Sequence, residues 1–274
     1  MKFSQIAFSL LPMLLTSSCG PGFPSDPVLL ETTSGNSTSS TSPLIASGAK
    51  LLLDANDFSA NGSTPASSCA STTWVDLSGG NHNGTLNCAG GGGFTGAGTT
   101  ANPYAVSFNG TSTYVATSLN TQSNTMPSTT WVAWVKPGSG SFSHLMSIDN
   151  HGGAFNRSIL TDGSGNWGVF TGPSAPTTYT PVTYTQGQWQ NLAVVFTATD
   201  IIIYLNGTPY DRASAPSYGV TANSFTIGRS GGAAFDYFTG AVNWLAVYDR
   251  ALTASEVSDT CKALQSRFSS VACN

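Results

Sequence analysis

The chain has 274 residues, of which only 8% are charged, and its formal net charge is −4. With nine Lys and Arg residues in total, it lacks the basic surface that nucleic acid or an anionic membrane would attract. The hydrophobic fraction of 40% argues against disorder throughout, and the length suits one large β domain with a real core.

The N-terminus has the pattern of an export signal that ends at a cysteine. Met1 and Lys2 form a short basic start, residues 3–15 are mainly apolar, and small residues precede Cys19. The apolar run is too short to span a membrane. The segment resembles a bacterial lipobox, although Thr16 stands where Leu is usual. We therefore expect a signal peptide over residues 1–18 and acyl chains on Cys19; a plain signal peptide that contains a cysteine is the alternative.

Residues 19–45 are rich in Gly, Ser, Thr and Pro. Such a segment buries too little apolar surface to order itself, so we expect a flexible tether between the lipidated Cys19 and a domain over residues 46–274. This organisation predicts a lipid-anchored protein of the bacterial cell envelope, at the outer membrane or cell surface. The lipid would then be the protein's only contact with the membrane.

The sequence of residues 46–274 predicts short strands separated by turns that contain Gly, Asn, Pro and Ser. Residues 130–136 alternate with apolar side chains on both faces, which predicts a central strand covered on both sides. Residues 191–197 and 200–205 predict a hairpin in the core, and Asn206-Gly207 supplies the next tight turn. Residues 238–248 form the last long strand.

One helix is expected in the mature chain. Thr253-Ala-Ser-Glu256 has the spacing of a capping box, in which the threonine and the glutamate satisfy each other's backbone N–H groups. The helix should therefore start at this point and run toward Arg267.

Four cysteines remain if Cys19 receives lipid, and an even number in an exported chain indicates disulfides. Four cysteines allow three connectivities. We favour Cys69–Cys88 and Cys261–Cys273 because both close short loops, and each would contribute roughly 2–4 kcal/mol. A zinc site is the weaker alternative, because neither pair has the two-residue spacing of zinc motifs.

A series of short segments rich in tryptophan, glycine and asparagine is spaced along the last two thirds of the chain: WVDLSG (74–79), VSFNG (106–110), WVAWVKP (131–137), GQWQNL (187–192), IYLNG (203–207), FTIG (225–228), FTG (238–240) and VYDRAL (247–252). In this order they resemble the laminin-G-like jelly roll of the concanavalin A-like lectin/glucanase superfamily. The resemblance covers roughly residues 48–260. It implies an all-β fold, a two-sheet antiparallel β-sandwich with a short C-terminal helix.

Enzymes of this superfamily hydrolyse β-glucans with two glutamates close together on one strand. Retaining hydrolysis needs paired carboxylates about 5–5.5 Å apart. The only glutamates here are Glu31, in the tether, and Glu256, in the helix cap. Serine-nucleophile and His-Glu-x-x-His motifs are also absent from the sequence. We therefore expect no enzyme, while a carboxylate pair assembled across the fold stays open.

Calcium is the cofactor to consider. Residues 74–84, WVDLSGGNHNG, resemble the family's Asp-x-Ser-Gly-Asn turn, where oxygen ligands from Asp76 and Asn81 would suit Ca²⁺. The resemblance places a further ligand on the last strand, at the position of Asn243. Asn keeps an oxygen but has no charge, so affinity should fall. The alternative is an Asx-type turn without metal.

Sugar binding requires exposed aromatic and polar side chains. Our candidates are Trp167, Phe235, Asp236, Tyr237 and the loop residue His151. For each of them, ordinary packing or a polar loop position is the alternative. The remaining strand tryptophans are expected in the core: Trp131, Trp134, Trp189 and Trp244.

A lectin-like fold without the enzyme's carboxylates favours a non-catalytic recognition module for glycans or a surface protein. A structural or adhesive envelope protein is the second hypothesis, and a divergent glycosidase the third. The fold by itself does not choose between them.

Overall fold

The computed structural model describes residues 47–138, 140–149, 156–170, 177–214, 218, 223–232 and 235–274, without the side chains of 177–181 and 211–214. The predictions for the signal peptide, Cys19 and the tether lie outside the described residues, as does His151.

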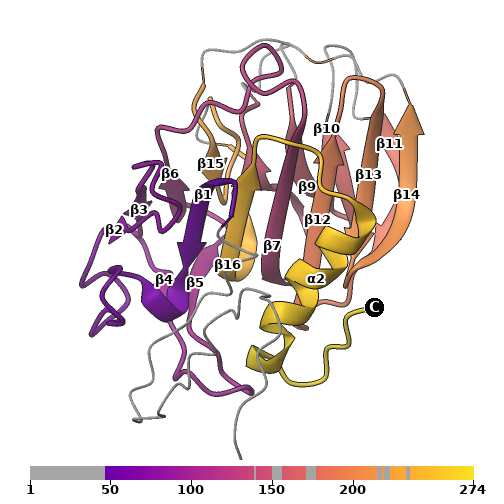
Figure 1. Cartoon of the computed structure of the whole chain (residues 1–274). Helices are drawn as coiled ribbons and strands as arrows, with labels where there is room; N and C mark the ends of the chain where they lie inside the picture. The colour runs from indigo at the N-terminus through magenta and orange to yellow at the C-terminus, as the bar shows by residue number, and fades with distance from the viewer. Residues whose placement is uncertain are drawn as a thin grey trace, which may run out of the picture. The chain divides into compact units, whose positions relative to one another are not determined.

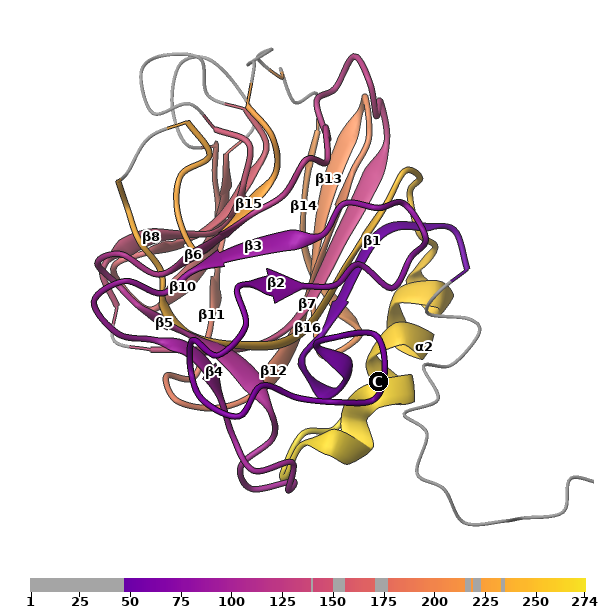
Figure 2. The same cartoon turned by 90° about the vertical axis from the view of Figure 1, so that its left-hand side faces the viewer.

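The described residues form a sandwich of two eight-stranded sheets whose paired strands are all antiparallel (Figures 1 and 2). We call the first sheet A. Its strands are, in spatial order, β14 (Thr208–Ser214), β13 (Asp200–Leu205), β12 (Gln190–Phe196), β7 (Thr129–Pro137), β16 (Thr239–Tyr248), β5 (Ala105–Asn109) and β4 (Gly93–Thr95), with β1 (Ala49–Asp54) also paired to β16.

Sheet B lies opposite sheet A across the core. In spatial order it contains β11 (Thr177–Thr183), β10 (Asn166–Phe170), β9 (Ser158–Asp162), β8 (Phe142–Ser147), β15 (Thr226–Ile227), β6 (Tyr114–Ala116), β3 (Gly84–Asn87) and β2 (Thr73–Trp74). The expected two-sheet antiparallel sandwich is confirmed.

Strand β7 lies in the middle of sheet A and is buried on both faces, as its sequence predicts. Trp131 points between the sheets, where its ring centroid lies 4.9 Å from that of Phe225, next to β15 of sheet B. Trp134 points to the opposite face of sheet A and is equally buried. A strand that buries both faces needs a cover on each side.

The outer cover is the C-terminal helix α2 (Ala254–Leu264), which continues into the short 3₁₀ helix η2 (Gln265–Arg267). Figure 2 shows α2 on the face of sheet A that points away from sheet B. Val257, Cys261 and Leu264 of α2 are buried against that face. No helix of the described residues combines the length and apolarity needed to cross a bilayer.

The predicted capping box is present at the start of α2. Thr253 Oγ1 accepts a hydrogen bond from the backbone N–H of Glu256, and the Glu256 carboxylate accepts one from the backbone N–H of Thr253. The same carboxylate accepts a hydrogen bond from Arg250 at 2.9 Å. Arg250 and the cap together lower the pKa of Glu256 to about 2.

Both predicted disulfides are formed. Cys261 of α2 is joined to Cys273, twelve residues later, which ties the C-terminal tail to the helix. Cys69 is joined to Cys88 directly after β3, across a separation of 19 residues. This second bridge holds the long connection between the 3₁₀ helix η1 (Ala55–Asp57) and β2 against sheet B.

The hairpin of β12 and β13 and its following turn are also confirmed. Asn206 and Gly207 have φ values of 50° and 81°. Both residue types tolerate this left-handed region of backbone conformation. The side-chain oxygen of Asn206 accepts a hydrogen bond from the backbone N–H of Asn191 at 2.8 Å, which fixes the turn to β12.

Replacing Trp134 with Ala should destabilise the fold by about 3–5 kcal/mol. Its ring is stacked on Phe268 with centroids 4.1 Å apart, so truncation opens a cavity beneath the C-terminal cover. Denaturant titration measures the loss. Tyr210→Ala, at a side chain that is 60% exposed, is the control and should cost less than about 1 kcal/mol. Equal effects of the two variants would contradict the proposed packing.

Candidate functional site

Trp167 is not available to a ligand, and its prediction as a sugar-binding residue is wrong. The side chain is only 2% exposed and belongs to the core between the sheets. Its ring lies 5.1 Å from that of Tyr184, and its Nε1 donates to Gln190 at 3.3 Å. The strand alternation of β10 turns the indole inward, which the surrounding polar turn residues concealed.

The segment Phe235–Asp236–Tyr237 does reach the surface, on the outer face of sheet B. Phe235 is 54% exposed, and Asp236 and Tyr237 are half-buried. The carbonyl of Asp236 accepts a hydrogen bond from the backbone N–H of His144 on β8, at 2.9 Å. These three residues therefore remain candidates.

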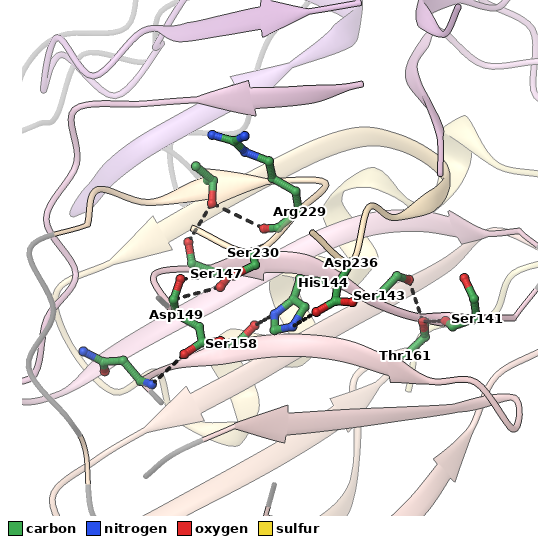
Figure 3. A network of polar contacts seen from close by, with 12 residues as sticks. Ser141, Ser143, His144, Ser147, Asp149, Ser158, Thr161, Arg229, Ser230 and Asp236 are labelled. Atoms are coloured by element: carbon green, nitrogen blue, oxygen red, sulfur yellow. Dashed lines mark hydrogen bonds and ion pairs between the residues drawn. The ribbon is translucent and has the colours of Figure 1, made fainter. Parts of the chain in front are cut away.

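Beneath this segment lies a row of polar side chains that has the residue types of a hydrolase triad (Figure 3). His144 Nδ1 lies 2.5 Å from Ser158 Oγ, and its Nε2 lies 3.7 Å from a carboxylate oxygen of Asp236. Ser158 and His144 are fully buried, and Ser158 Oγ donates to the carbonyl of Met146. A nucleophile must be reachable by substrate, and Ser158 is not. The row is suited to a structural role, in which His144 of β8 and Ser158 of β9 hold Asp236 against the sheet.

A groove of about 540 Å³ opens on another part of the outer face of sheet B. We call it the Tyr114 groove. It is lined by Cys69, Thr72, Thr85, Leu86, Asn87, Cys88, Ala89, Tyr114 and Ala116.

The groove follows from the alternation of β3 and β6. Leu86 and Val115 point into the core, so their neighbours point outward. In the strand register Thr85 lies opposite Ala116, while Asn87 lies opposite Tyr114. Because Ala116 is small, the floor is hollow between the larger side chains.

Tyr114 connects the groove to the Phe235–Tyr237 segment. Its hydroxyl accepts a hydrogen bond from Asn87 Nδ2 at 3.4 Å, and its ring centroid lies 6.4 Å from that of Tyr237. The guanidinium of Arg229 lies over the Tyr114 ring, 3.7 Å from its centroid. Our sequence reasoning missed Asn87, Tyr114 and Arg229; the only available signal was the outward position of Tyr114 beside a core valine.

The contacts of Asp76, one of the proposed calcium ligands, are those of a backbone turn. Both oxygens of Asp76 accept backbone hydrogen bonds: Oδ1 from Leu52 and Ser78, at 3.0 and 2.9 Å, and Oδ2 from His82 at 2.9 Å. Asn81 occupies a left-handed turn position with φ of 59°. This is the Asx-type turn that we had given as the alternative.

Asn243 belongs to a different cluster, so the prediction that it completes a calcium site is wrong. Its Nδ2 donates to Asn56 and to the carbonyl of Tyr104, and its Oδ1 accepts from Arg267 at 3.3 Å. Arg267 also donates two hydrogen bonds of 2.8 Å to the fully buried carboxylate of Asp54. A guanidinium already neutralises this cluster, and the residues do not fit calcium. The described residues contain no group of three acidic, His or Cys side chains suited to a metal.

The family can be assigned once the sandwich and its outer faces are known. The sequence model of the concanavalin A-like lectin/glucanases superfamily matches residues 108–258, more than half of the chain. The chain belongs to this superfamily. Membership in this superfamily agrees with the two-sheet architecture. Comparison with curated proteins gives no match.

Solved structures share the fold at low sequence identity. Domain 4 of the GH43 extracellular arabinanase of Geobacillus stearothermophilus, in complex with arabinotriose, is 20% identical with a TM-score of 0.51; the match covers 68% of this chain and 91% of that one. The binding domain of botulinum neurotoxin DC, in complex with SialylT, is 13% identical with a TM-score of 0.53, over 81% of this chain and 52% of that one. Trypanosoma rangeli sialidase is 18% identical with a TM-score of 0.55, over 81% of this chain and 33% of that one.

Replacing Arg267 with Met should cost about 3–5 kcal/mol, because the buried Asp54 carboxylate loses its counter-charge. Arg250→Met is the matched control: its partner Glu256 is partly exposed, so the loss should be below about 1 kcal/mol.

Chelation with EDTA should leave the unfolding midpoint of the unmodified chain unchanged. A midpoint that falls with EDTA and recovers with Ca²⁺ would show that a calcium site exists after all.

Proposed function

We propose that this chain is a non-catalytic recognition protein that binds glycans through the Tyr114 groove. The observation on which the proposal rests is the groove's composition. An aromatic ring, the Asn87 amide and the hydroxyls of Thr72 and Thr85 surround one hollow. Sugars present apolar C–H faces and many hydroxyls, so they need this combination of an aromatic surface and hydrogen-bonding groups. A volume of about 540 Å³ is sufficient for a short saccharide.

The contacts of the acidic residues support a non-catalytic role. A glycosidase acid needs a raised pKa. Although burial raises the pKa of Asp162, hydrogen bonds from Asn166 and from the backbone of Ser164 lower it more, and the net shift is downward. Asp149 is buried, and Asp236 faces His144. These local roles favour binding over hydrolysis.

Two of the structures that share the fold were solved with arabinotriose and with SialylT. At 20% and 13% identity they support a carbohydrate ligand as a class and say nothing of which sugar. A protein ligand on the cell surface is the second candidate, because Phe142 and Phe235 are exposed aromatic side chains near the groove's side of the molecule.

The binding test uses a glycan array with the purified full-length chain. We expect reproducible binding to one sugar class and about a tenfold loss of affinity in Tyr114→Ala, through lost ring contact. Tyr210→Ala, on sheet A, is the matched control and should bind normally. Binding that survives Tyr114→Ala would move the site elsewhere, and silence of a folded protein would favour the protein-ligand or structural role.

We further propose that the chain is displayed on the bacterial cell envelope by acyl chains on Cys19. The apolar residues 3–15 and the small residues before the cysteine support this location. The other four cysteines are joined in two disulfides, which accounts for every cysteine of the sequence except Cys19.

Replacing Cys19 with Ser should abolish incorporation of labelled fatty acid and move the protein from the membrane fraction to the soluble fraction. Cys69→Ser is the matched control and should keep the label. Unchanged labelling of the Cys19 variant would refute lipidation at this residue.

A further inference from the structure

Arg229 has a charge that no carboxylate of the described side chains neutralises. Its guanidinium carbon lies over the Tyr114 ring, 3.7 Å from the centroid, and its Nε–H is shielded from solvent without a hydrogen-bond partner. Figure 3 shows the guanidinium directed away from the row formed by His144 and Asp236. Asp236 therefore does not pair with it.

Four of the other cations of the described residues have oxygen partners. Three of them form ion pairs: Lys50 with Asp249, Arg250 with Glu256, and Arg267 with Asp54. The buried Arg157 donates to three backbone carbonyls. A half-buried cation without such a partner is energetically unfavourable. Among the described side chains this is the situation of Lys136, which lies over Trp189, and of Arg229, which lies over Tyr114. Of the two, Arg229 is the cation beside the Tyr114 groove.

The position of Arg229 relates it to the groove. Tyr114 lines the groove and is also the ring on which the guanidinium lies, at 3.7 Å. The groove lining contains no charged side chain, so no protein carboxylate there competes for the guanidinium. Stacking on the ring holds the planar group in place, and a fixed guanidinium binds a carboxylate or a sulfate through paired hydrogen bonds.

We propose that the Tyr114 groove binds acidic glycans, with Arg229 pairing with a carboxylate or sulfate group of the sugar. This inference rests on the proposed glycan-binding function and adds the ligand's charge. The saccharide lies against Tyr114 and the groove's hydroxyl and amide groups, while its anionic group reaches the guanidinium. Neutral sugars of the same size lack this last contact.

The test compares defined probes on the purified full-length chain by calorimetry. The probes are trigalacturonate, its carboxyl-reduced neutral counterpart, and a sulfated galactose trisaccharide. We expect the trigalacturonate or the sulfated probe to bind at least about tenfold more tightly than the neutral one, with affinity falling as salt rises. The two anionic probes decide which oxyanion is preferred.

The variants are Arg229→Met, Arg229→Lys and the control Lys136→Met, whose ammonium lies over Trp189 on sheet A. Arg229→Met should remove the preference for the acidic probe while leaving the weak neutral binding, and Arg229→Lys should retain part of it. Lys136→Met should behave like the unmodified chain. Thermal unfolding of each variant confirms that it is folded.

The possible outcomes distinguish a failure of the Arg229 proposal from a failure of the proposed glycan-binding function. Equal binding of acidic and neutral probes, or a preference that survives Arg229→Met, would overturn the role of Arg229 and leave glycan recognition standing. A preference lost in Lys136→Met would move the anion site to sheet A and equally overturn the proposal. Absence of binding to every probe, together with silence on the array, would refute glycan recognition itself.

Discussion

The rest of the structure depends on a strand that must be buried on both faces. The apolar residues of β7 alternate without a polar face, so sheet A cannot leave its outer side in water. Sheet B covers one face, and α2 with Phe268 covers the other through the stacked pair of Trp134 and Phe268. The Cys261–Cys273 bridge and the cap at Thr253 then secure the helix that supplies this cover. Much of the outer face of sheet A is therefore occupied by the chain itself, and the Tyr114 groove lies on sheet B.

The second feature of the structure is the way in which its few charged residues are paired. With 8% charged residues, most described charges have an assigned local partner, and several of these partnerships are structural. The Asp54–Arg267 pair joins β1 to η2 inside the molecule. Asp76 closes a turn with its backbone contacts. Arg229 and Lys136 differ from these charges, because each lies over an aromatic ring and has no carboxylate partner among the described side chains.

The outer face of sheet B combines three elements that sequence order keeps far apart. The Cys69–Cys88 bridge and β3 form one side of the groove, and Tyr114 of β6 forms the other. The segment that contains Asp236 arrives from near the C-terminus and is held by His144. Recognition of a saccharide on this face would use a rigid sheet as its platform, with hydroxyl and amide groups already oriented. Ser158 is a poor candidate for a nucleophile because its side chain is fully buried.

The sequence by itself determined the strands with strong periodicity and the capped helix at Thr253, because these depend on neighbours close along the chain. It favoured the disulfide pairing that the structure forms but left two other connectivities open. It also predicted the superfamily correctly. Only the tertiary structure decided which aromatic residues line a surface groove: Trp167 stands among polar turn residues yet points inward, while Tyr114 gave little signal and lines the groove. Likewise Arg267 reaches Asp54 across 213 positions of the chain. Such contacts depend on strand register and sheet packing, which local residue patterns do not encode.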